Sequence, residues 1–111
     1  MTNIQIIQKL LHEVENLCLP YNRKVFDDLY VLRLKTLARR IGTKQSIVIR
    51  YIVDVLKMKG FKGILITSKR EKGGNTYIIY CSRNPQNILK FKELFKNEFR
   101  LLKIKREIIE N

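Results

Sequence analysis

Few residues in this sequence could carry out catalysis. The single histidine, His12, has no partner at a catalytic or metal-ligand spacing. The adjacent acids Asp27 and Asp28 are more typical of a helix start than of an acid–base pair. The chain also lacks a glycine-rich phosphate loop. We therefore expect no enzymatic activity, no metal, no cofactor and no small-molecule substrate.

The two cysteines, Cys18 and Cys81, lie far apart in the sequence, and neither belongs to a C-x-x-C motif. Each occupies an apolar position of its segment, which favours reduced thiols in the core. The alternative is a disulfide between them.

The charge of the chain is strongly positive, with 23 Lys and Arg against 10 Asp and Glu and a net charge of +13. Residues 33–53 carry no acid and six bases: Arg33, Lys35, Arg39, Arg40, Lys44 and Arg50. Such a distribution attracts polyanions and favours a nucleic acid as the partner. The alternative is a surface that lysines merely solubilise.

The most informative pattern lies in residues 37–52. Ala38 is small enough for two helices to cross closely, Gly42 permits a sharp turn, and Val48 packs an apolar side chain back on the first helix. The spacing predicts a helix that ends at Gly42 and a second helix over residues 46–59. This arrangement resembles the helix-turn-helix motif.

A predicted helix and a predicted hairpin flank this pair. The first helix follows from apolar residues at spacings of three and four, namely Ile4, Ile7, Leu11, Val14 and Cys18. Residues 64–69 and 76–82 are rich in Ile, Thr and Tyr around a glycine turn, which predicts a β-hairpin. Residues 29–34 fit either a strand or a helix. Over residues 4–83 the order resembles the winged helix-turn-helix fold.

The resemblance implies a role for each face of the helix pair. In that family the second helix enters the major groove of DNA. The residues that would read bases here are Lys44, Gln45, Ser46, Ile49 and Arg50. Arg50 would bond guanine and Gln45 would bond adenine. Ile49 would either touch a thymine methyl group or form a subunit contact.

The resemblance also implies contacts with the DNA backbone. Lys35, Arg39 and Arg40 would bind phosphates, which position a protein without specifying a sequence. The wing would reach the adjacent minor groove or its phosphates through Lys69, Arg70, Lys72, Gly73 and Gly74. The alternative for both sets is a solvated, charged surface.

Residues 84–111 are predicted to form one long helix, with Asn84 as N-cap and Pro85 at the first helical position. Its apolar stripe includes Ile88, Phe91, Phe95, Leu102 and Ile109. Monomers avoid exposing a stripe of this length. We therefore expect a homodimer, with a DNA-binding domain at 1–83 and a coiled-coil dimerisation helix at 84–111. The alternative is a helix folded back on its own core.

The predicted fold class is thus α+β, mostly α: a winged helix-turn-helix with a hairpin wing and a long C-terminal helix. The combination resembles crenarchaeal chromatin-associated winged-helix proteins and those of archaeal viruses and plasmids. It implies double-stranded DNA as the partner, for a transcription regulator or an architectural chromatin protein. A protein-interaction module is the third possibility. Without a membrane-length apolar run or a signal-peptide layout, we expect a cytoplasmic, nucleoid-associated protein.

Overall fold

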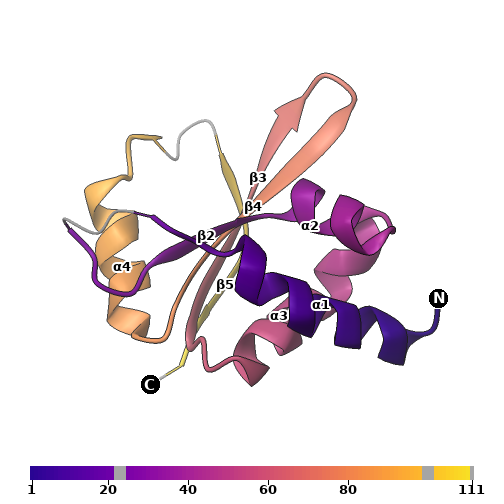
Figure 1. Cartoon of the computed structure of the whole chain (residues 1–111). Coiled ribbons are helices and arrows are strands. Elements are labelled where there is room, and N and C mark those ends of the chain that lie inside the picture. The colour runs from indigo at the N-terminus through magenta and orange to yellow at the C-terminus, as the bar shows by residue number, and fades with distance from the viewer. Residues whose placement is uncertain (22–24, 99–101, 111) are drawn as a thin grey trace.

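The computed structural model describes residues 1–21, 25–98 and 102–110. In this part of the chain, a five-stranded antiparallel sheet of order β1-β2-β4-β3-β5 lies between two helical layers (Figure 1). Helices α1, α2 and α3 pack on one face, and α4 packs on the other. The elements are α1 (Asn3–Leu17), β1 (Leu19–Pro20), β2 (Tyr30–Arg33), α2 (Leu34–Ile41), α3 (Gln45–Met58), β3 (Gly63–Glu71), β4 (Gly74–Ser82), α4 (Pro85–Leu94) and β5 (Lys103–Ile109).

Helix α1 is confirmed, and a capping box begins it. The Gln5 backbone N–H donates to Thr2 Oγ1 over 3.2 Å, and the Thr2 N–H donates to Gln5 Oε1 over 2.8 Å. Both bonds satisfy N–H groups that the first turn leaves free. The buried side chains are Ile6, Leu10 and Val14, whereas Ile4 is exposed. The helix was therefore predicted correctly, but its buried face is rotated from the predicted one.

The helix pair is confirmed as two helices joined by a tight turn. Gly42 has a φ of 81°, in the left-handed region that glycine tolerates, and its N–H donates to the Ala38 carbonyl over 2.9 Å. Ala38 and Val48 are both buried in the core between the helices and the sheet. Turn and packing together fix how α3 projects from α2.

The hairpin is confirmed too, and residues 30–33 form a strand. In the β3–β4 register, Ile66 lies opposite Ile79, and Glu71 lies opposite Gly74 at the tip. Strand β2 pairs with β4, and its last residue, Arg33, lies opposite Ile78. Beyond that pair the hairpin extends past β2, and it stands out from the body of the molecule in Figure 1.

The predicted long C-terminal helix is wrong, and with it the predicted fold class. Asn84 does cap a helix, because its side chain accepts from the Gln86 N–H over 3.1 Å. That helix, α4, ends at Leu94, and β5 follows as an edge strand beside β3. A short final helix and a sheet of this size distinguish the fold from the predicted winged helix with a long helical tail.

The predicted dimerisation residues belong to the chain's own structure. Ile88 and Phe91 are 0% and 1% exposed, and they pack on Leu65 and Tyr80 of the sheet. Phe95 and Ile109 pack partly buried against the same cluster. Leu102 is half-buried and precedes β5. The apolar repeat therefore combines a helix and a strand that cover the chain's own sheet.

Close packing of α4 on the sheet leaves no space for a side chain at Gly63. A Cβ atom there would lie 2.7 Å from Ile88 Cγ1 and 3.0 Å from Pro85 Cα. We predict that Gly63→Ala lowers the free energy of unfolding by about 1–3 kcal/mol, the usual cost of overpacking. Urea unfolding measures it. The loss should shrink in an Ile88→Ala background, and an equal loss in both backgrounds would contradict the proposed clash.

Candidate nucleic-acid interface

The first half of α3 presents a polar, basic surface to solvent. Lys44, Ser46 and Arg50 are exposed, and α3 has no acidic residue in its first turn. Within the described ranges, Arg50 forms no ion pair. Its guanidinium is therefore available to an external acceptor such as a base edge or a phosphate.

Gln45 lies differently from its prediction, because it is engaged by the hairpin. Its Oε1 atom accepts from the Tyr77 N–H over 3.5 Å. The last pair between β2 and β4 joins Arg33 to Ile78, and Tyr77 is the next β4 residue towards the hairpin tip. Its N–H has no β2 partner, and Gln45 takes that place. While this bond holds, the amide faces the hairpin. The contact with adenine stays a prediction, and it would require Gln45 to release this bond.

Ile49 is also less exposed than a base-reading residue should be. It is half-buried and packs against the main core. Packing within the chain therefore accounts for an apolar side chain at this position, without a thymine or a second subunit.

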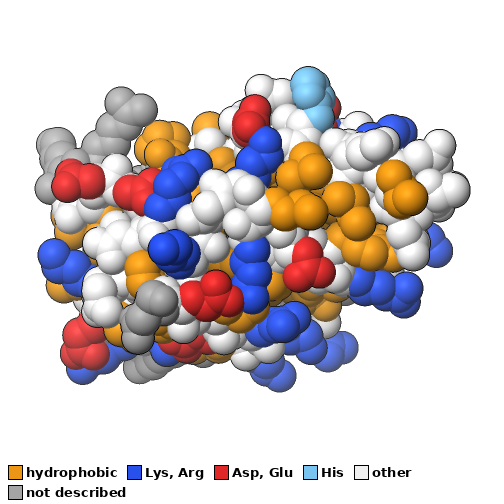
Figure 2. Space-filling model, turned by 90° about the horizontal axis from the view of Figure 1, so that it is seen from below, with side chains coloured by type: hydrophobic (Ala, Val, Ile, Leu, Met, Phe, Trp, Pro, Cys, Tyr) orange, Lys and Arg blue, Asp and Glu red, His pale blue; other side chains and the backbone are white. Residues whose placement is uncertain are grey.

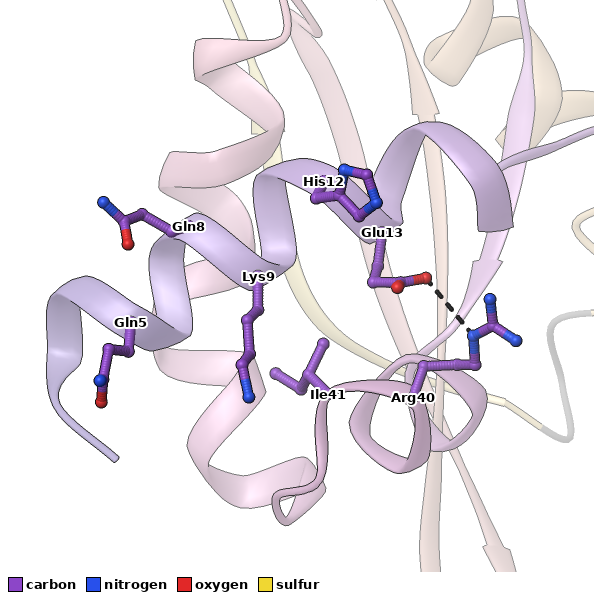
Figure 3. A pocket seen from close by; sticks show the side chains of 7 residues that line it. All are labelled: Gln5, Gln8, Lys9, His12, Glu13, Arg40 and Ile41. Atoms are coloured by element: carbon purple, nitrogen blue, oxygen red, sulfur yellow. Dashed lines mark hydrogen bonds and ion pairs between the residues drawn. The ribbon is translucent and has the colours of Figure 1, made fainter.

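The predicted phosphate-binding residues of α2 divide into two groups. Lys35 and Arg39 are exposed and form no ion pair within the part of the chain that the structure describes. Arg40 turns towards α1, where its Nε lies 3.4 Å from Glu13 Oε2 (Figure 3). Arg40 therefore links α1 to α2, and its availability to DNA is reduced.

This ion pair borders an open pocket of about 360 Å³ between α1 and α2. The residues that line it are Gln5, Gln8, Lys9, His12, Glu13, Arg40 and Ile41 (Figure 3). Among the described residues, no group of three or more His, Cys, Asp or Glu side chains could hold a metal ion. Nothing in the lining points to a particular reaction.

The hairpin tip lies close to the start of both helices. A recess of about 140 Å³ joins Lys35 of α2 and Gln45 of α3 to Lys72, Gly73 and Gly74 of the turn. Glu71 also lines this recess and accepts from Thr76 Oγ1 over 2.8 Å, whereas Lys69 and Arg70 are exposed further along β3. The structure thus brings together residues predicted for base reading, backbone binding and the wing.

The ion pairs of the described residues lie mostly away from this surface. The pairs other than Arg40–Glu13 are Lys57–Glu110, Lys59–Glu15, Arg83–Asp28, Lys92–Glu107 and Lys96–Glu93. Figure 2 shows the side from which the hairpin tip points away, and acidic and basic side chains are interleaved there. On the hairpin side, Lys35, Lys69, Arg70 and Lys72 form no ion pair among the described residues, and Glu71 is the acid that lies beside them, so the net charge there is positive.

The two cysteines are free thiols that interact with each other. A hydrogen bond from Cys81 lowers the pKa of the half-buried Cys18 below its ordinary value. The same bond, together with burial, raises the pKa of Cys81 well above its own ordinary value. Cys18 also lines a pocket of about 380 Å³ beside Arg83, whose guanidinium carbon lies 4.4 Å from the centre of the Phe61 ring.

We predict that iodoacetamide alkylates Cys18 before Cys81 in the native protein. Because a lowered pKa produces thiolate at lower pH, the reaction midpoint for Cys18 should lie below that of an ordinary cysteine. Replacing Cys81 by alanine removes the donor and should move that midpoint upward. Mass spectrometry of digested samples measures both rates, and equal labelling of the two thiols would contradict the expected pairing.

Comparison with protein-family models, with curated proteins and with solved structures finds no match to this chain. Within the described ranges, no helix combines the length and the apolar character needed to cross a membrane.

Sequence reasoning missed Lys103 and Lys105, which lie beside the hairpin on β5. Their segment was predicted to be helical, so its lysines had no expected neighbour on the sheet. The alternation in Lys103-Ile104-Lys105 was the available signal for a strand.

Proposed function

We propose that this protein binds double-stranded DNA, with the first half of α3 in the major groove and the β3–β4 hairpin on the adjacent minor groove or backbone. The observation that carries the proposal is the placement of uncompensated cations. Lys35 and the hairpin tip line one recess with Gln45 of α3, and Lys44 and Arg50 are exposed at the start and on the first half of the same helix. Five of the six ion pairs of the described residues lie elsewhere.

Two physical arguments support this placement. The major groove is about 12 Å wide and admits an α-helix. The amino-terminal end of a helix also carries a partial positive charge, which favours nearby phosphates. In α3 that end is exposed and is flanked by the hairpin.

A salt titration of duplex binding tests the proposal. Seven exposed cations on α2, the start of α3 and the hairpin form no ion pair among the described residues, namely Lys35, Arg39, Lys44, Arg50, Lys69, Arg70 and Lys72. If each contacts one phosphate, log K should fall against log salt with a slope of about −6, at about −0.9 per contact. Fluorescence anisotropy with a labelled duplex measures it. No binding at low salt, or a slope near zero, would refute the proposal.

The bond between Gln45 and Tyr77 bears on how strongly the protein should prefer one DNA sequence. A transcription regulator needs several side chains that read bases, but Gln45 is turned towards the hairpin and Ile49 is half-buried. This favours an architectural DNA-binding protein with modest sequence preference over a regulator with a strict operator. Selection from a random duplex pool decides between them, since a specificity ratio above about 10³ is typical of a regulator.

The homodimer stays a prediction, without the helix on which it was based. Ile88 and Phe91 are occupied within the chain, so they are not available to a second copy. Sedimentation equilibrium of the full chain, with and without duplex, measures the oligomeric state directly.

A further inference from the structure

A second polar groove lies on the β5 side of the hairpin, whereas the recess beside α3 lies on the β4 side. It has a volume of about 370 Å³, and the residues that line it are Ser68, Arg70, Asn75, Lys103, Ile104 and Lys105. Three of these six side chains are cationic. The groove joins the protruding end of β3 and β4 to the start of the edge strand β5.

The groove opens on the same face of the sheet as the helix pair. Ile64 and Ile66 of β3 belong to the core under α1, α2 and α3. Because side chains alternate along a strand, Ser68 and Arg70 point to that same face. Lys103 lies directly opposite Ser68 in the β3–β5 register and shares its orientation.

An irregularity in β5 brings a further cation, Arg106, to the same face of the sheet, outside the lining of the groove. Ile66 pairs with Arg106 and Thr67 pairs with Ile104, so Lys105 is an extra residue in the ladder. Extra residues of this kind redirect the side chains that follow them. Here Arg106 is brought opposite Ile66, on the helix-pair face, which it would not occupy in a regular strand.

The charges of this groove are available to a partner. Arg70, Lys103 and Lys105 are exposed, and none of them forms an ion pair within the described part of the chain. The neighbouring acid Glu71 accepts a hydrogen bond from Thr76.

The groove lies a short distance from the start of α3. Gln45 bonds the outer edge of β4, and the strands follow in the order β4, β3, β5. Two strand spacings amount to about 10 Å. The start of α3 and this groove therefore flank the hairpin on one face, within the footprint of one duplex.

We infer that this groove binds the sugar–phosphate backbone of the same DNA duplex, through Arg70, Lys103 and Lys105. The inference rests on the proposed function and adds a contact outside the helix pair. The duplex then straddles the hairpin, with α3 on the β4 side and β5 on the other. Phosphate contacts of this kind strengthen binding to every sequence equally.

Another role for lysines on an edge strand is protection against pairing with a second copy. That role predicts a change of oligomeric state when the lysines are removed, and no change in the salt dependence of DNA binding. The two roles therefore differ in what they predict for one variant.

The experiment compares two double variants that remove equal charge. The test variant combines Lys103→Gln with Lys105→Gln. The control combines Lys62→Gln, which precedes β3 at the end opposite the tip, with Lys90→Gln on α4. Gly63 and Glu71 are about 27 Å apart along β3, so Lys62 lies far from the groove. All four lysines are exposed, so both variants should fold, which circular dichroism checks.

The test variant should bind every duplex more weakly by a similar factor. Its salt slope should be shallower by about 2 than that of the parent, at about 0.9 per lost contact. The control should keep the parent slope. A parent slope retained by the test variant would overturn the inference and leave the proposed function standing, whether or not the variant self-associates in sedimentation. If the parent does not bind duplex DNA at all, the proposed function fails first and this inference with it.

Discussion

Replacement of Arg50 by alanine is expected to lower the affinity for the preferred duplex by about 1–3 kcal/mol and to relax the base preference. Arg50 is exposed on α3 and forms no ion pair among the described residues, so its guanidinium is free to bond guanine O6 and N7. With Gln45 bonded to the hairpin, few other side chains of α3 could supply that preference.

The matched control for this change is Arg39→Ala, which removes the same side chain from α2. Arg39 is exposed and is expected to contact phosphate alone. Its loss should weaken all sequences equally and reduce the salt slope by about 1. Competition titrations with preferred and scrambled duplexes measure both variants. If Arg50→Ala kept the parent's base preference, the placement of α3 in the major groove would be wrong.

The sequence predicted the elements whose signals are local. Gly42 ends α2 because it adopts a positive φ, and Asn84 begins α4 because its side chain caps the first turn. The hairpin follows from two β-rich runs around Gly73 and Gly74. Each of these signals lies within a few residues of the feature that it specifies.

The C-terminal half of the apolar repeat was misread for a physical reason. Positions seven residues apart share one face of a helix, but the same spacing also arises when a short helix and a strand cover one sheet. Ile88 belongs to α4 and Ile109 to β5, and both contact the cluster around Leu65. Periodicity alone does not reveal where the helix ends and the strand begins.

The candidate site was predicted in composition but not in detail. Exposure of Ser46 and Arg50 follows from the period of α3, and Lys44 is exposed as the residue that precedes the helix. The partners of Gln45 and Arg40 lie 32 and 27 residues away in the sequence, so only the tertiary fold brings them together. Residues of this kind look free in the sequence and are engaged in the folded chain.

Replacement of Phe91 by alanine is expected to lower the free energy of unfolding by about 3–5 kcal/mol. The ring is 1% exposed, and its centre lies 4.7 Å from that of Tyr80 and 6.0 Å from that of Phe26. Removing it leaves a cavity between α4 and the sheet. Because domains of this size are stable by only about 5–15 kcal/mol, this one change removes a large share of the total.

Leu94→Ala is the matched control, because Leu94 lies one turn further along α4 and is 55% exposed. Its replacement should change the unfolding free energy by no more than about 0.5 kcal/mol. Urea denaturation at two protein concentrations measures both variants. Packing of α4 on its own sheet requires the large loss at Phe91 to be independent of concentration. Equal losses at both positions, with stability rising with concentration, would instead indicate a helix whose apolar face is shared between two chains.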